Sequence, residues 1–233
     1  MAEKQKVRQF CPECGAEYEQ PELAHCPEDG ARLRELDFKS DEDDPLLGEI
    51  LDDRFKVESV LGEGGMGRVY VGEQLSVERP VAIKTLRPQV DSQEIIVKRF
   101  MRESRVISKL THPNIVNLVD FGRDTEHELL YLVLELVDGI PGDELLDQGR
   151  LTPELAVHIA GQLCGGLSQA HGEGVIHRDL KPENLMLVPL SDGRLETKLL
   201  DFGVAHAVQE DSNLTASGSV WGTPYYMAPE QAE

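Results

Sequence analysis

One short stretch of the chain gathers side chains that could carry out phosphoryl transfer. His177-Arg178-Asp179-Leu180-Lys181-Pro182-Glu183-Asn184 is followed by Asp201-Phe202-Gly203. In such a reaction a carboxylate orients the attacking hydroxyl, metal ions neutralise the phosphates, and a cation follows the migrating charge. An isolated Asp-Phe-Gly triplet arises easily by chance. The eight-residue string with the triplet downstream is specific, and it predicts an active site.

A glycine-rich segment could hold the phosphates. Residues 62–69 read Gly-Glu-Gly-Gly-Met-Gly-Arg-Val. Glycines let the backbone approach phosphate oxygens closely and offer amide donors. A dinucleotide-binding turn shares the pattern but needs a helix directly after the glycines. Here Val69-Tyr70-Val71 continues as a strand, which disfavours that alternative.

Lys84 ends the otherwise apolar run of residues 81–84. An ammonium group in apolar surroundings needs a partner, because burying it alone is costly. Glu103 shares one face of a predicted helix with four apolar residues, namely Ile96, Phe100, Ile107 and Leu110. We therefore expect a Lys84–Glu103 ion pair. The alternative is that Glu103 reaches solvent.

The elements that must position these groups are short strands and two helices. Apolar runs predict strands over residues 55–61, 68–73, 80–86, 115–121 and 129–137. Asp91 as N-cap with Glu94 at N3 predicts a helix between the third and fourth strands. Thr152 as cap and Pro153 at N1 predict a second helix. Its apolar stripe comprises Ala156, Ile159, Ala160, Leu163, Leu167 and Ala170, with Cys164 as a small core residue.

From Arg54 to Glu233 the motifs resemble those of eukaryotic-type (Hanks-type) serine/threonine protein kinases, bacterial members in particular. The resemblance implies an α+β, two-lobed protein-kinase-like fold. Residues 54–137 would form an N-lobe with an antiparallel sheet and one helix, and residues 138–233 a mainly helical C-lobe. That lobe would be truncated, because family members continue with further helices after Ala228-Pro229-Glu230.

The resemblance also implies an ATP site. Val69 and Ala82 would cover the adenine and Met186 would lie beneath it. Residues 134–137 would form the hinge, with Leu134 as gatekeeper. The expected nucleotide-binding residues are Leu61, Gly62, Gly64, Gly67, Val69, Ala82, Lys84, Glu135, Val137 and Met186.

Four residues are expected to be catalytic by the same resemblance: Asp179, Lys181, Lys84 and Glu103. Asn184 and Asp201 would bind Mg²⁺, which prefers carboxylate, amide and phosphate oxygens. Lys181 and the segment Gly222-Thr223-Pro224 resemble serine/threonine-specific members. The expected partners are proteins with Ser/Thr acceptors, including another copy of the chain through autophosphorylation in trans. Candidate acceptors in the activation segment are Thr215, Ser217 and Ser219.

The first 34 residues resemble a zinc ribbon. Cys11-Pro12-Glu13-Cys14-Gly15 and Cys26-Pro27-Glu28-Asp29-Gly30 are near-copies of one knuckle. Cys11, Cys14 and Cys26 with Asp29, or with His25 in its place, would complete a structural zinc site. A metal-free segment and a disulfide are the alternatives. The acidic residues 35–53 read as a linker to the kinase-like region.

Composition narrows the remaining possibilities. The 233 residues carry a net charge of -20, which disfavours nucleic acids and anionic membrane surfaces as partners. No apolar run of about 18 residues predicts a membrane span, and the first residues do not resemble a secretory signal, so we expect a cytoplasmic protein. A membrane anchor in a C-terminal continuation stays open. Two other functions stay open: a nucleotide-binding but catalytically impaired regulatory fragment, and an interaction protein with a kinase-like scaffold.

Overall fold

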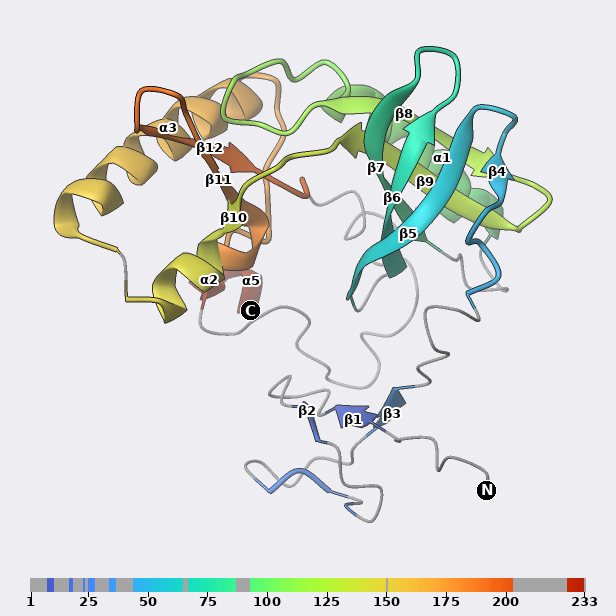
Figure 1. The fold of residues 1–233 in the computed structure, drawn as a ribbon, viewed down its shortest axis with the longest axis horizontal. Helices are drawn as coiled ribbons and strands as arrows, with labels where there is room; N and C mark the ends of the chain where they lie inside the picture. Colours follow the sequence, from blue (N-terminus) through green and yellow to red (C-terminus); the bar gives the residue numbers. More distant parts are fainter. Residues whose placement is uncertain are drawn as a thin grey trace. The chain divides into compact units, whose positions relative to one another are not determined.

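The computed structural model describes residues 8–10, 17–18, 23, 25–27, 34–36, 44–64, 67–86, 93–149, 151–202 and 226–232 (Figure 1). The chain divides into two compact units, each described by itself. One comprises residues 48–213, and the other comprises residues 1–47 and 214–233. No helix among the described residues has both the length and the apolar character needed to cross a membrane.

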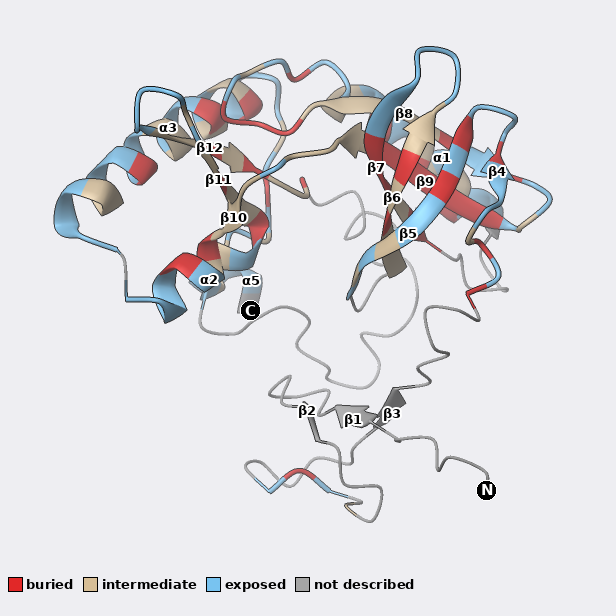
Figure 2. Ribbon diagram, in the orientation of Figure 1, coloured by how far each residue is buried: buried red, intermediate tan, exposed pale blue. Residues whose placement is uncertain are grey.

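A six-stranded antiparallel sheet forms the first half of the larger unit, in the order β4-β5-β6-β7-β9-β8. The strands are β4 (Ile50–Leu51), β5 (Phe55–Gly64), β6 (Gly67–Gln74), β7 (Arg79–Leu86), β8 (Leu118–Asp124) and β9 (Leu129–Glu135). The five predicted strands are all present. Buried positions gather in the central strands β7 and β9 (Figure 2).

The sheet begins earlier than the sequence predicted. Ile50 and Leu51 were assigned to the acidic linker, but they form the edge strand β4 and pair with Lys56 and Phe55. The Leu51 side chain is fully buried. Because burying this apolar side chain is favourable, the folded region begins before Arg54, on its N-terminal side.

Helix α1 (Gln93–Ile107) packs against the sheet through a core that includes Leu86 and Leu130. Asp91, its predicted cap, lies outside the described residues. The fully inward row of α1 is Ile96, Phe100 and Ser104, at four-residue spacing. Glu103, predicted to lie on the inward stripe, is only partly buried. One position along a helix rotates a side chain by roughly 100°, so Ser104 takes the buried place.

The second half of the larger unit combines a small sheet with helices. β10 (Ile140–Pro141), β11 (Leu185–Pro189) and β12 (Leu195–Leu199) form an antiparallel sheet in that order. The helices are α2 (Gly142–Asp147), α3 (Pro153–Gly172) and the 3₁₀ helix η3 (Pro182–Asn184). Ile115 bridges to Leu199 and shares a core with Leu110, Ala170 and Phe202.

Helix α3 begins as predicted, with Pro153 at its first position. Thr152 Oγ1 accepts a hydrogen bond of 3.3 Å from the Leu155 N–H. The buried residues of α3 are Ile159, Gly166 and Ala170. Ala160 and Cys164, which were predicted to be core, are exposed. The prediction placed these two residues in the core because of their apolar character. The structure instead buries Gly166, whose lack of a side chain permits close packing: an added Cβ would lie 3.2 Å from the Ile115 side chain.

The smaller unit contains a three-stranded antiparallel sheet in the order β2-β1-β3. Its strands are β1 (Arg8–Phe10), β2 (Glu17–Tyr18) and β3 (Arg34–Leu36). A short helix, α5 (Pro229–Ala232), belongs to the same unit. Cys26 is buried and forms no disulfide, and His25 is exposed. Cys11, Cys14 and Asp29 lie outside the described residues.

Candidate active site

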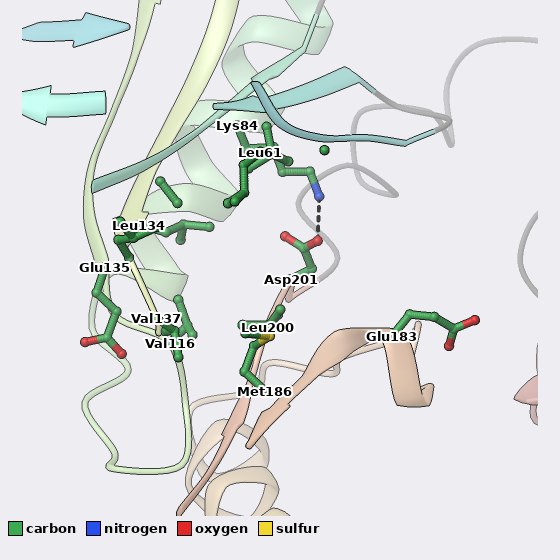
Figure 3. Close-up of a pocket in the computed structure, with 14 residues that line it drawn as sticks. Leu61, Lys84, Val116, Leu134, Glu135, Val137, Glu183, Met186, Leu200 and Asp201 are labelled. Atoms are coloured by element: carbon green, nitrogen blue, oxygen red, sulfur yellow. Dashed lines mark ion pairs between the residues drawn. The ribbon is translucent and has the colours of Figure 1, made fainter. Parts of the chain in front are cut away.

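A pocket of about 310 Å³ lies between the six-stranded sheet and the small sheet β10-β11-β12 (Figure 3). Eight of the ten residues expected to bind a nucleotide line it: Leu61, Gly62, Val69, Ala82, Lys84, Glu135, Val137 and Met186. Gly67 is not among the described residues that line it, and Gly64 is described only by its backbone pairing with Gly67. The lining is predominantly apolar, with Lys84 and Asp201 among its charged members.

Strand register explains why these side chains meet. Val69 on β6 lies directly opposite Lys84 on β7, and Ala82 lies opposite Leu134 on β9. Directly opposed residues in an antiparallel pair have their side chains on the same face of the sheet. Met186 on β11 supplies the facing wall from the small sheet.

Gly67 begins β6 with a φ of 151°, and an added Cβ would lie 1.8 Å from the Thr85 carbonyl oxygen. Only glycine fits this position, since any side chain would collide with the backbone of β7. The glycine therefore permits the close approach of β6 to β7 at this point. On the other side of β6, Gly67 pairs with Gly64 across the β5-β6 hairpin.

The Lys84 ammonium pairs with Asp201, not with Glu103. Lys84 Nζ lies 2.8 Å from Asp201 Oδ2, and the two side chains are 15% and 33% exposed. No ion pair joins Lys84 to Glu103, both of which are described residues. The need of Lys84 for a carboxylate was predicted correctly, but the partner was wrong, because α1 turns Ser104 inward. Asp201 has a φ of 50°, in the left-handed region.

The other predicted catalytic groups converge on Asp179. Lys181 Nζ lies 3.2 Å from Asp179 Oδ2. Asn184 Nδ2 donates to Asp179 Oδ2 at 2.9 Å and to the Asp179 carbonyl oxygen at 2.6 Å. Asn184 is buried, and because its amino group makes both bonds, its Oδ1 remains available as an acceptor. The 3₁₀ turn η3 places Asn184 close to Asp179, so these two hydrogen bonds stabilise the loop of residues 179–184.

His177 links this loop to the segment that carries Asp201. The Asp179 N–H donates to His177 Nδ1 at 3.3 Å, so Nε2 carries the ring proton and donates to the Leu200 carbonyl oxygen at 2.6 Å. The ring also packs on Phe202, with centroids 4.9 Å apart. Arg178 has a φ of 67°. The buried imidazole is therefore a structural brace between Asp179 and Leu200.

Six lining residues lay outside the predicted nucleotide set: Val116, Leu134, Leu136, Glu183, Leu200 and Asp201. Leu134 and Leu136 belong to the predicted hinge, and Asp201 was assigned to the metal. Val116 and Leu200 were missed. The Val116 N–H donates to the Leu199 carbonyl oxygen at 3.0 Å, so Val116 lies beside the end of β12, and both Val116 and Leu200 line the pocket. No motif marks either residue, because each is one apolar position in an apolar run.

Comparison with known proteins agrees with this geometry. The protein kinase domain family matches residues 55–232. Serine/threonine-protein kinase pkn2 of Myxococcus xanthus is 44% identical over 185 residues, covering 78% of this chain and 22% of that protein. Serine/threonine-protein kinase pkn3 of the same organism is 40% identical over 199 residues, covering 84% and 36%.

Serine/threonine-protein kinase PrkC of Bacillus subtilis (strain 168) is 36% identical over 188 residues, covering 80% of this chain and 28% of that protein. The chain thus spans between about a fifth and about a third of the length of these relatives. A crystal structure of the Mycobacterium tuberculosis PknI kinase domain superposes with a TM-score of 0.57 at 29% identity, covering 68% of this chain and 62% of that one. The chain belongs to the protein kinase domain family.

Proposed function

We propose that the protein transfers the γ-phosphoryl group of Mg-ATP to serine and threonine hydroxyls of proteins. The observation that carries the proposal is the Lys84–Asp201 pair inside an apolar pocket, together with the Asp179–Lys181–Asn184 cluster. The names of the relatives, all serine/threonine-protein kinases, support the same class of acceptor.

The described residues fit ATP and Mg²⁺. The apolar lining suits a planar base, and Lys84 supplies a cation for phosphate oxygens. The Asp201 carboxylate and Asn184 Oδ1 are the oxygen ligands that Mg²⁺ prefers. When bound, Mg-ATP supplies the phosphoryl group and the metal charge that offsets its negative oxygens.

The chain's own groups divide the remaining tasks. Asp179 would accept a hydrogen bond from the acceptor hydroxyl and orient it, and Lys181 would stabilise negative charge on the transferred group. Asn184 braces Asp179 through two hydrogen bonds. Lys84 would release Asp201 in part as it binds phosphate oxygens, because one ammonium has three donors to share.

Intact-mass measurement after incubation with Mg-ATP tests the proposal. The wild-type chain should gain multiples of one phosphate, and Lys84→Met should gain none when incubated alone. Adding wild-type protein should phosphorylate Lys84→Met if the reaction runs in trans. Phosphoamino-acid analysis should give phosphoserine or phosphothreonine. Thr215, Ser217, Ser219 and the segment Gly222-Thr223-Pro224 lie outside the described residues.

The same experiment separates the alternatives. A chain that binds ATP without gaining phosphate, and without phosphorylating a generic basic protein, is a nucleotide-binding regulatory fragment. A chain that does not bind ATP at all leaves only the interaction scaffold.

We also propose that the N-terminal segment binds structural zinc through Cys11, Cys14, Cys26 and either Asp29 or His25. The burial of the Cys26 thiol in a segment too short for a large core supports it. No group of three or more potential ligands occurs among the described residues, which omit Cys11, Cys14 and Asp29. About one zinc per chain, lost in the Cys11→Ser/Cys26→Ser double variant, is the expected result. A metal-free wild-type protein after purification in zinc-containing buffer would refute this.

A further inference from the structure

We propose that Lys198, which is not in the pocket lining, positions the hinge for adenine by holding the Glu135 carboxylate. The inference rests on the proposed function, because it concerns how the same pocket keeps its shape around a nucleotide. It assigns to Lys198 a positioning role, not contact with the ligand.

The hinge residue Glu135 is held at three points. Its Oε1 accepts a hydrogen bond from Lys198 Nζ at 2.6 Å, and its Oε2 accepts one from Asn117 Nδ2 at 3.1 Å. Its backbone N–H donates to the Asn117 carbonyl oxygen at 3.0 Å. Figure 3 shows the carboxylate turned away from the Lys84–Asp201 pair. The Glu135 side chain therefore binds other residues of the protein, which leaves its main chain to face the pocket that Glu135 lines.

Lys198 occupies a position that connects the pocket walls. It lies on β12, opposite Met186 on β11 and three residues before Asp201. Glu135 ends β9 of the six-stranded sheet. Their ion pair thus joins the sheet that carries Val69 and Ala82 to the sheet that carries Met186. These are the two apolar walls between which a planar base would insert.

The charge and burial of the Lys198–Glu135 ion pair explain why its loss should affect base binding and not phosphate binding. The Lys198 side chain is 16% exposed and that of Glu135 is 28% exposed, so both charges are largely removed from water. Removing one partner leaves the other charge without its compensating group, which favours movement of Glu135 toward solvent. Since Glu135 is bonded at both backbone and side chain, such movement would displace the hinge peptide groups. Base binding should suffer, and phosphate binding should not.

The test compares two ligands, Mg-ADP and adenosine, by calorimetric titration. Lys198→Met should weaken both by about tenfold, a typical size for coupling between neighbouring sites. Lys84→Met should weaken Mg-ADP but leave adenosine unchanged, because adenosine has no phosphate. Lys198→Arg should bind nearly as well as wild type. Lys109→Met removes the same charge at an exposed position and serves as the matched control.

A purely structural role for the pair would give a different result. If folded Lys198→Met binds adenosine as tightly as wild type, the inference is overturned. If that variant does not fold, Glu135→Gln and the reciprocal Glu135→Lys/Lys198→Glu exchange decide. The inference requires weaker adenosine binding in the first and recovery in the second to within about threefold of wild type. If wild-type protein binds neither ligand, the proposed function fails instead.

Discussion

The two walls of the pocket are built by different means. The six-stranded sheet holds its side through regular strand pairing and apolar burial, with Ile83 and Val133 fully buried opposite each other. The other side depends on single polar contacts, such as those of His177 and Asn184, in a backbone that enters the left-handed region at Arg178 and Asp201.

The difference separates stability from chemistry. Many small contributions hold the six-stranded sheet, so losing one apolar side chain lowers the free energy of unfolding while the pocket keeps its register. Few contacts hold the catalytic loop, so losing one polar group changes the reacting geometry directly. Four predictions probe this contrast, in order of decreasing effect.

Asp179→Asn should give the largest change. The variant keeps the size of the side chain but loses its negative charge, and phosphoryl transfer should fall by about 10³-fold or more. Folding and Mg-ADP binding should stay near wild type. Steady-state assays with a basic protein substrate, alongside nucleotide titration, measure both. Retention of full activity would place the chemistry elsewhere.

Ile83→Ala should lower the free energy of unfolding by about 3 kcal/mol, because it leaves a cavity in the centre of the six-stranded sheet. Its nucleotide affinity should change little while the protein stays folded. Urea denaturation gives the stability, and Val77→Ala, at a position 61% exposed, is the control. An equal loss in both variants would contradict the picture of a packed sheet.

Thr152→Ala should cost about 1 kcal/mol of unfolding free energy, because the Leu155 N–H loses its side-chain acceptor at the start of α3. Thr152→Ser keeps the hydroxyl and should restore most of the loss. Both variants can be followed by the same denaturation experiment. This change tests whether a single polar contact away from the catalytic loop affects stability alone.

Asp124 should give the smallest effect, visible as a pH dependence. Burial alone raises the pKa of Asp124. The backbone N–H groups of His127 and Asp52 and the His127 ring lower it, and the pKa lies below its ordinary value of 3.8. The stability that Asp124 contributes is thus fully present above the unfolded-state pKa and is lost as pH falls through the folded-state value.

The stability difference between wild type and Asp124→Asn should accordingly shrink as the pH is lowered from about 6 to about 3. Glu126→Gln, at an exposed position in the same turn, should show no comparable trend. A difference that stays constant over this range would mean that the charge of Asp124 contributes nothing. Asp124 is thus a buried charged residue within a sheet held mainly by apolar contacts.

Sequence patterns predicted the two walls unequally. Apolar runs predicted all five main strands, because burial on a pleated sheet imposes its own periodicity. They missed β4, since two residues are too few for a pattern. Motif resemblance located Asp179, Lys181, Asn184 and Asp201, which no periodicity could have done, as their conformations are irregular.

Sequence patterns could not predict which side chains of different helices and strands would contact one another. The choice of Asp201 over Glu103 depends on the rotation of α1, which a shift of one residue decides. The exposure of Cys164 depends on which face of α3 is buried, and Gly166, which packs closely on Ile115, marks that face. The Glu135–Lys198 pair joins residues 63 positions apart, and neither belongs to a catalytic motif.

Both backbone polar groups of Leu200 are bonded to the catalytic loop: its N–H donates to the Asn184 carbonyl oxygen at 2.8 Å, and its carbonyl oxygen accepts from His177. These bonds join the loop that carries Asp179 to the residue directly before Asp201, so we expect a shift of one carboxylate to be accompanied by a shift of the other. Because Leu200 also lines the pocket, a displacement of its backbone should alter both carboxylates and the wall of the base site together.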